Sequence, residues 1–213
     1  MSRTRKSATA AQTRAYAARA DVLAPQLRAE IARVPAVAHG RAALVLLMGL
    51  PGVGKTHCAR LLAERLGAAH VASDELRSRL FIAASYADEE NRAVFAAVTA
   101  LVDGLLGEGH RVVVDATNLV ARNRAGTVGV ARRRGIPVTY VRVTSSDEDA
   151  RGRLASRRAG RAAGDHSEAD EPIYERMRRQ PFEPPAEGFL ELTNGADLAG
   201  EIDRIVAGVE RAS

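Results

Sequence analysis

The chain has no tryptophan, and aromatic residues make up only 4% of its 213 positions. Proteins that bind single-stranded nucleic acid stack its bases on aromatic side chains. The scarcity of aromatic residues therefore argues against base stacking as the main way in which this chain would bind nucleic acid. Cys58 is the single cysteine, which excludes a disulfide within the chain and suits a reducing cytoplasm. The longest apolar run, Ala42 to Met48, is far shorter than the ~20 residues that span a bilayer, so we expect no membrane segment.

Lysine is even scarcer than the aromatic residues. Of 31 cationic residues, only Lys6 and Lys55 are lysines. The net charge of +5 and the pI near 10 favour anionic partners, whether nucleotides, phosphorylated substrates or nucleic acid, without choosing among them. The chain is 46% hydrophobic and 27% charged, which is ordinary for a globular domain.

Lys55 lies in a phosphate-binding sequence of the form G-x-x-x-x-G-K-[ST]. The sequence context fits this motif, because an apolar run that predicts a strand precedes it and a helical pattern follows. In such a loop, backbone N–H groups surround the phosphates of ATP, the lysine contacts the β and γ phosphates, and the Thr56 hydroxyl ligates Mg²⁺. The predicted ATP-binding residues are Gly49, Gly52, Val53, Gly54, Lys55 and Thr56.

The chain from Ala42 onward alternates β-rich runs with helical stretches. This alternation predicts an α/β fold with a mainly parallel five-stranded sheet and helices on both faces. In such a fold, ligands bind at the carboxyl ends of the strands. The expected strands are 42–48, 69–72, 111–115, 137–143 and 189–192, and the expected helices are 55–66, two or more within 73–108, 119–134, 147–159, 172–179 and 197–211.

Glycines and prolines mark the expected ends of these elements. Gly67, Gly107 and Gly135 each fall where a helix should stop in a left-handed cap. Before the first strand, residues 1–40 form a basic tail and an alanine-rich helical extension over about 10–34, interrupted by Pro25. We therefore expect residues 41–213 to form one domain, with a lid over the nucleotide at about 151–179.

Two acidic residues lie at or just beyond the ends of predicted strands. Asp115 ends the run Val112 to Val114, as expected of a carboxylate that orders Mg²⁺, although it could instead cap the next helix. Asp74 follows the short strand 69–72 at the start of a helix, where it could serve as a cap or accept a proton from a substrate hydroxyl. Arg77, one turn later, could hold a substrate anion.

Together these residues resemble a known family of phosphate-transferring proteins. The resemblance rests on the run from Leu44 to Arg77, the Val-Val-Val-Asp-Ala-Thr-Asn-Leu stretch at 112–119, the arginine-rich segment 151–158 and the Pro-Ile-Tyr stretch at 172–174. The chain is similar to P-loop kinases of the polynucleotide 5′-hydroxyl kinase and zeta-toxin-like group, and looks closest to the small bacterial AAA-type ATP-binding proteins. Such proteins have a P-loop NTPase, nucleoside-kinase-like fold.

The resemblance implies ATP-dependent, Mg²⁺-assisted transfer of the γ-phosphoryl group to a hydroxyl acceptor, either a polynucleotide 5′-hydroxyl or a small metabolite. It assigns Asp74 as the general base and Arg77 to the substrate. It also assigns Arg153 and Arg157 as lid arginines, although Arg151 and Arg158 are close enough in sequence to take either place. Lys55 completes the catalytic set.

Two alternatives remain at this point. A nucleotide-dependent switch or plain NTPase would use the same loop without an acceptor, but it would not require the pair Asp74 and Arg77. Nucleic-acid binding as the main role rests on charge alone and would weaken steeply with salt. Thr193, Asn194 and Gly195 follow the last predicted strand and could line a base pocket. The oligomeric state and the preference for ATP over GTP have no signal in the sequence.

Overall fold

The computed structural model describes residues 28, 41–81, 87–159 and 171–212. Their strands are β1 (Leu44–Met48), β2 (Ala69–Ala72), β3 (Val112–Asp115), β4 (Val138–Thr144) and β5 (Leu190–Thr193). Their helices are α3 (Lys55–Leu66), α4 (Ser73–Leu80), α5 (Asp88–Gly107), α6 (Ala121–Arg133), α7 (Asp147–Ala159), α8 (Glu171–Arg178) and α9 (Leu198–Ala212). The predicted extension at 10–34 lies outside these residues except for Arg28.

The five strands form one sheet in the order β2-β3-β1-β4-β5, and every pairing is parallel. The predicted α/β fold is thus confirmed, with a sheet that is wholly parallel across the described strands. All five residues of β1 and all four of β3 are buried, as expected for strands covered on both faces. Parallel strands place their carboxyl ends at one edge, and the predicted site residues lie in the strand ends, loops and helices at that edge or just beyond it.

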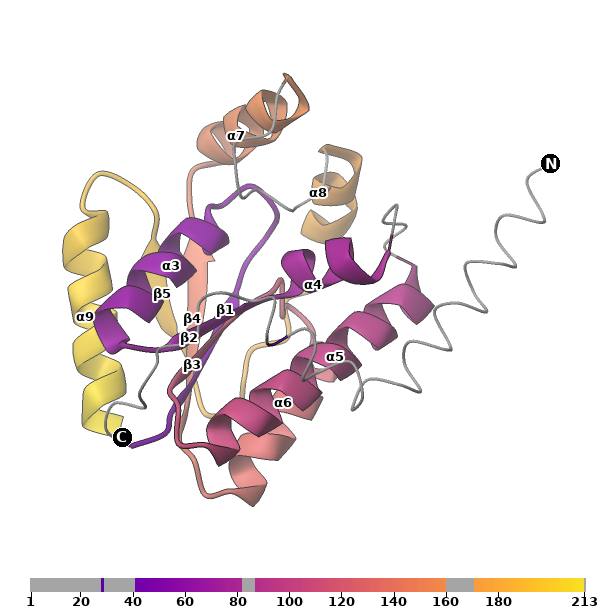
Figure 1. The fold of residues 1–213 in the computed structure, drawn as a ribbon. Helices are drawn as coiled ribbons and strands as arrows, with labels where there is room; N and C mark the ends of the chain where they lie inside the picture. The colour runs from indigo at the N-terminus through magenta and orange to yellow at the C-terminus, as the bar shows by residue number, and fades with distance from the viewer. Residues whose placement is uncertain (1–27, 29–40, 82–86, 160–170, 213) are drawn as a thin grey trace.

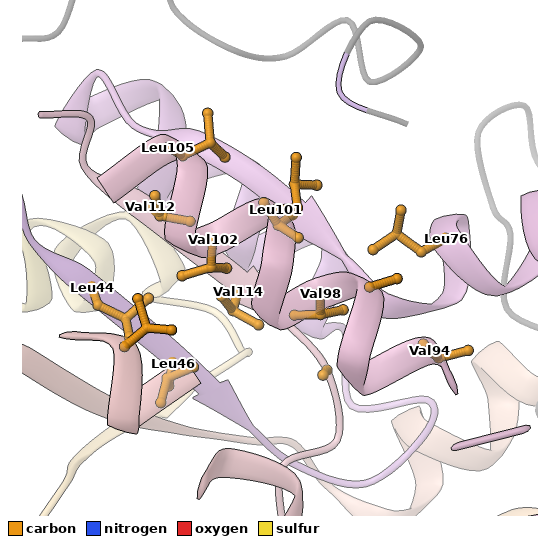
Figure 2. Packing of buried hydrophobic residues seen from close by; sticks show 14 of the residues in the cluster. Leu44, Leu46, Leu76, Val94, Val98, Leu101, Val102, Leu105, Val112 and Val114 are labelled. Carbon is orange, nitrogen blue, oxygen red and sulfur yellow. The ribbon is translucent and has the colours of Figure 1, made fainter. Parts of the chain in front are cut away.

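Side chains of β1 alternate between two hydrophobic clusters, one on each face of the sheet. Leu44, Leu46 and Met48 pack in one cluster with residues of α4, α5 and α6, and Figure 2 shows the two leucines near Val102 of α5 and Val114 of β3. Val45 and Leu47 pack on the opposite face, against α3 and α9. The sheet therefore lies between two helical layers, while α7 and α8 lie beyond the carboxyl ends of the strands (Figure 1).

Helices end close to all three predicted glycines, and two of the three have the left-handed conformation. Gly67 caps α3 in the left-handed conformation, and Gly135 has a φ of 65° just after α6. Helix α5 also ends at Gly107 as predicted, but the left-handed cap predicted there is wrong, because the left-handed residue is Gly109, with a φ of 85°. Residues 108–111 connect α5 to β3, and the left-handed turn falls on the second of them. Within the described residues, no helix is long and apolar enough to cross a lipid bilayer.

Candidate active site

The predicted phosphate-binding loop connects β1 to α3 at the carboxyl edge of the sheet. Gly49 donates its N–H to the carbonyl of Thr117 at 3.0 Å, which ties the start of the loop to the segment after β3. Gly54 has a φ of 92° and immediately precedes α3, a conformation that residues with a side chain rarely adopt. The loop therefore presents the positive end of α3 where phosphates are expected.

Lys55 begins α3 and folds back over the loop. Its Nζ donates to the carbonyl of Leu50 at 2.8 Å, so the ammonium lies against the backbone that is predicted to hold the phosphates. One turn along α3, Cys58 is fully buried, and burial raises the pKa of its thiol from 9.0 to about 12. A thiol that stays protonated at neutral pH is a poor nucleophile, so Cys58 serves to pack the core.

Asp115 is the last residue of β3 and is only 5% exposed. Its Oδ2 lies 3.6 Å from Nε2 of His70 on the neighbouring strand β2. Burial acts to raise the pKa of Asp115, but interactions with His70, Lys55 and Thr56 outweigh burial and hold the pKa below its ordinary value. The carboxylate is therefore ionised at neutral pH.

The closeness of Thr56 to Asp115 fits the role in binding Mg²⁺ that the sequence predicts for both residues. The Thr56 hydroxyl lies close enough to the carboxylate to lower its pKa, so two oxygen donors of the kind that Mg²⁺ prefers lie together beside the loop. The alternative role for Asp115, as a cap of the next helix, is not what the structure shows. Helix α6 begins at Ala121, whose N–H donates to Oε2 of Glu183 at 2.6 Å.

Asp74 lies in the first turn of α4, directly beyond β2. The strand register aligns Ala72 with Asp115, so Asp74 follows the β2 end that lies beside the predicted metal ligand. The N-cap position of α4 is Ala72, which has no side-chain cap hydrogen bond. Because β3 lies between β2 and β1, Asp74 leaves the sheet ~10 Å from the strand that carries the loop. That spacing leaves room for a phosphoryl group and an acceptor hydroxyl.

Arg77 lies one turn beyond Asp74 and is 5% exposed. Its Nη1 donates to the carboxylate of Glu90, which is 1% exposed, and its Nη2 donates to Oδ1 of Asn91 at 2.9 Å. Its Nε lies 3.9 Å from Oδ1 of Asp74. The guanidinium predicted to hold substrate is therefore bound to α5, and it also lies close to the predicted base.

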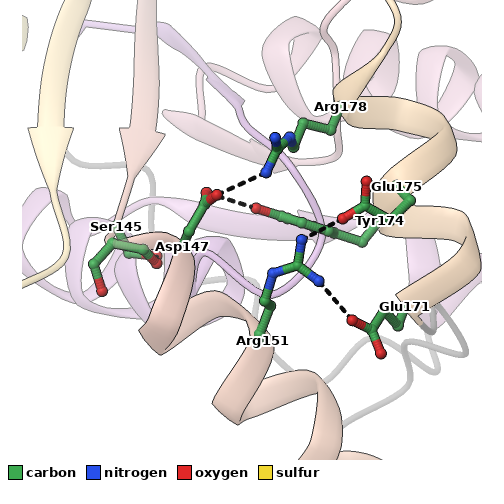
Figure 3. Close-up of polar contacts among 8 residues, drawn as sticks. Ser145, Asp147, Arg151, Glu171, Tyr174, Glu175 and Arg178 are labelled. Atoms are coloured by element: carbon green, nitrogen blue, oxygen red, sulfur yellow. Dashed lines mark hydrogen bonds and ion pairs between the residues drawn. The ribbon is translucent and has the colours of Figure 1, made fainter.

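The arginines of α7 have separate partners. Nη1 of Arg153 donates to the carbonyl of Gly52 at 3.1 Å, which places this predicted lid arginine on the phosphate-binding loop. Arg151 instead donates to Glu171, at 2.5 Å, and to Glu175, both on α8 (Figure 3). Arg157 lies on α7, but its side chain is outside the described part of the chain. Arg151 thus joins α7 to α8, and Arg153 is the arginine placed beside the loop.

Helices α7 and α8 are also joined around Asp147. The Tyr174 hydroxyl donates to Oδ1 of Asp147 at 2.9 Å, and Arg178 donates to Oδ2 at 2.7 Å (Figure 3). Tyr174 itself is buried, with 1% exposed. These bonds, with those of Arg151, fix the two described ends of the predicted lid segment to each other.

Several contacts at this edge were not predicted from the sequence. Asn118, at a φ of 48°, donates Nδ2 to the carbonyl of Leu47 at 2.9 Å, and Arg124 donates to the carbonyl of Asn118 at 2.6 Å. Asn194 donates Nδ2 to the carbonyl of Val53 at 2.9 Å. The sequence signal that these two asparagines share is a polar residue shortly after a strand, since Asn194 directly follows β5 and Asn118 comes three residues after β3. Glu90 has no comparable signal, because it lies among other acidic residues at the start of α5.

A groove of about 640 Å³ lies between α5 and α6. Its lining includes Arg92, Phe95 and Arg122, and none of the residues predicted for catalysis or for ATP. Asn91 also lines it and accepts a hydrogen bond from Arg77. The groove is therefore separate from the phosphate-binding loop and is joined to the Arg77 region through one side chain.

The sequence model of the AAA domain matches residues 44–185, which include the loop, Asp74, Asp115 and α7. The chain belongs to this family. As an AAA domain it has a P-loop nucleotide-binding, kinase-like fold, and the family match alone leaves the acceptor undetermined. Among curated proteins, no sequence match is found.

Solved structures share the fold of this AAA domain. Kti12 of Chaetomium thermophilum, in complex with ADP-AlF3, is 24% identical with a TM-score of 0.65, over 79% of this chain and 98% of that one. The Mycobacterium tuberculosis APS kinase CysC, in complex with AMPPNP and APS, is 22% identical with a TM-score of 0.61, over 81% and 99%. A gluconokinase from Sinorhizobium meliloti is 18% identical with a TM-score of 0.58, over 84% and 94%. At these identities the likeness shows the fold.

Proposed function

We propose that this protein is an ATP-dependent kinase that transfers the γ-phosphoryl group to a hydroxyl acceptor. The observation that carries the proposal is the position of Asp74 at the carboxyl edge of the sheet, two residues beyond Ala72, which β2 aligns with Asp115. A switch needs a loop and a metal carboxylate, but it has no use for a second carboxylate at the same edge of the sheet. Two of the structural neighbours bear the names of kinases, APS kinase and gluconokinase.

In the proposed reaction, Asp74 accepts the proton of the acceptor hydroxyl. The hydroxyl oxygen forms a bond to the γ phosphorus, the bond from that phosphorus to the β–γ bridging oxygen breaks, and ADP leaves with the electron pair. The loop amides and Lys55 hold the phosphates in line, and Arg153 lies close enough to the loop to neutralise charge there. Mg²⁺ bound near Thr56 and Asp115 would supply further neutralisation of phosphate charge.

The acceptor belongs to one of two classes in this proposal. The names of the kinase neighbours favour a small hydroxylated molecule, whereas the resemblance of the sequence to polynucleotide 5′-hydroxyl kinases favours a nucleic-acid end. Transfer of labelled phosphate from ATP to oligonucleotide 5′-ends, nucleosides, sugars, sugar acids and antibiotics distinguishes the two. We expect at least one acceptor class to be labelled by the wild-type protein.

The same assay tests the main alternative. A switch or plain NTPase would release inorganic phosphate at a rate that no acceptor changes. Labelled phosphate that appears only as inorganic phosphate, across all acceptor classes, would overturn the kinase proposal and favour that alternative. The control is Asp203→Asn on α9, where the carboxylate is 59% exposed and paired with Arg65. This variant should match the wild type with every acceptor.

A further inference from the structure

Two carbonyls of the phosphate-binding loop are held by side chains from elements far away in the sequence. Arg153 of α7 donates to the carbonyl of Gly52 at 3.1 Å, and Asn194 donates to the carbonyl of Val53 at 2.9 Å. Asn194 is the first residue after β5. Two side chains therefore hold the loop, one from α7 and one from the end of β5.

Holding these carbonyls also aims the N–H groups of the loop. In a planar trans peptide, the carbonyl of one residue and the N–H of the next point in opposite directions. A side chain that fixes the carbonyl of Gly52 thus turns the N–H of Val53 to the opposite side, and one that fixes the carbonyl of Val53 does the same for Gly54. These N–H groups are among those predicted to bind the phosphates.

Asn194 is itself well placed to do this. Its own N–H donates to the carbonyl of Thr144 at 2.8 Å, so its backbone is bound to the end of β4. The side chain lies directly over Gly54, because a Cβ added to that glycine would lie only 2.0 Å from Nδ2 of Asn194. The close approach explains why position 54 has no side chain, and it leaves the amide of Asn194 against the loop.

We propose that Asn194 is a positioning residue for the triphosphate, which keeps the N–H of Gly54 directed at a bound phosphate. This inference rests on the nucleotide-binding part of the proposed function and replaces the expectation that Asn194 lines a base pocket. Arg153 acts in the same way on the N–H of Val53. Only Asn194 gives a clean test, because Arg153 is also expected to meet phosphate directly.

The test measures affinity for magnesium tripolyphosphate, ATP and GTP by calorimetry. Asn194→Leu keeps the approximate volume of the side chain without its donor, and Asn194→Ala removes both. We expect both variants to bind all three ligands about tenfold more weakly, the scale of one hydrogen bond. The control, Glu191→Gln, changes a residue of β5 whose side chain is 62% exposed, and this variant should bind all three as the wild type does.

Each other outcome has one meaning. If the wild type fails to bind both ATP and tripolyphosphate, the proposed function itself fails. If the wild type binds and the two variants bind equally well, the inference about Asn194 is wrong. It is also wrong if tripolyphosphate binding is unchanged while ATP and GTP are weakened by different factors, since Asn194 would then contact the base.

A second measurement separates positioning from a general loss of structure. In amide proton spectra, the Gly54 N–H of the wild type should shift on addition of tripolyphosphate. That shift should be smaller in Asn194→Leu at ligand saturation, while the amides of α5, far from the loop, keep their wild-type positions. A variant that loses affinity but keeps the full Gly54 shift would contradict the proposed role, and lost α5 signals would identify unfolding.

Discussion

Arg77 donates a hydrogen bond to the carboxylate of Glu90, and this buried ion pair joins α4 to α5. Asp74 lies on the same helix as Arg77, with its Oδ1 3.9 Å from Nε of that arginine. Any force that holds Arg77 therefore also limits where the predicted base can lie. We expect Arg77 to orient Asp74, in addition to or in place of holding the substrate.

The Glu90–Arg77 pair should contribute strongly to stability. Glu90→Ala removes the carboxylate that neutralises the buried guanidinium of Arg77. Breaking a buried ion pair in this way costs ~3–5 kcal/mol of stability. Urea unfolding should show this loss in the free energy of unfolding. Glu89→Ala changes the preceding acidic residue, which is only partly buried, and should stay within ~0.5 kcal/mol of the wild type. Equal losses in both variants would contradict the assignment.

Asp74→Asn should separate catalysis from nucleotide binding. The amide cannot accept the acceptor proton, so we expect transfer to fall at least ~100-fold, while the affinity for ATP is unchanged. Initial rates of phosphate transfer and calorimetry check the two parts. The matched control is Glu75→Gln in the same helical turn, where the carboxylate pairs with Arg79, and its transfer rate should remain close to wild type. Unchanged turnover of Asp74→Asn would remove Asp74 from the mechanism.

Removal of magnesium should affect the wild type more than Asp115→Asn. We expect EDTA to weaken ATP binding by the wild type. Asp115→Asn lacks the carboxylate that is predicted to bind the metal. EDTA should therefore weaken ATP binding by this variant much less. In EDTA the variant should bind ATP no more weakly than the wild type does, because it has one negative charge fewer beside the phosphates. Asp103→Asn, on the surface of α5, is the control and should keep the full magnesium effect.

Asn118 should tolerate glycine better than alanine. Both changes remove the bond to Leu47, but alanine at a φ of 48° pays ~1–2 kcal/mol for the left-handed conformation. That cost exceeds the ~0.4–1 kcal/mol by which the freedom of glycine in the unfolded chain lowers stability. Thermal or urea unfolding should therefore rank Asn118→Gly above Asn118→Ala. At Asn123, inside α6, the order should reverse, since alanine favours helix.

Stability should fall at alkaline pH through Cys58. Its thiol has a pKa raised by burial from 9.0 to about 12, so the unfolded chain releases this proton before the folded one does. The stabilisation is complete below the unfolded pKa and is lost as pH rises toward the folded pKa. Urea unfolding at pH ~8 and ~10.5 should show a steeper decline for the wild type than for Cys58→Ala. Parallel declines would show that other groups dominate.

The sequence predicted the elements around the loop closely. Helix 55–66 and strand 69–72 have the same bounds in the structure, because an apolar strand pattern, a glycine cap and helical periodicity are all local signals. The roles of the arginines were harder to assign. Arg151 and Arg153 are two residues apart, and only the packing of α7 against α8 and the loop gives them different partners.

The sequence alone predicted the phosphate-binding loop, the alternation of strands and helices, and the two acidic residues at strand ends. Each of these features depends on residues within a few positions of one another. Tertiary structure decided which distant groups meet there: Glu90 with Arg77, His70 with Asp115, and Asn194 with Val53. Those pairs depend on strand order and on how helices pack across the sheet, and no short stretch of sequence determines either of them.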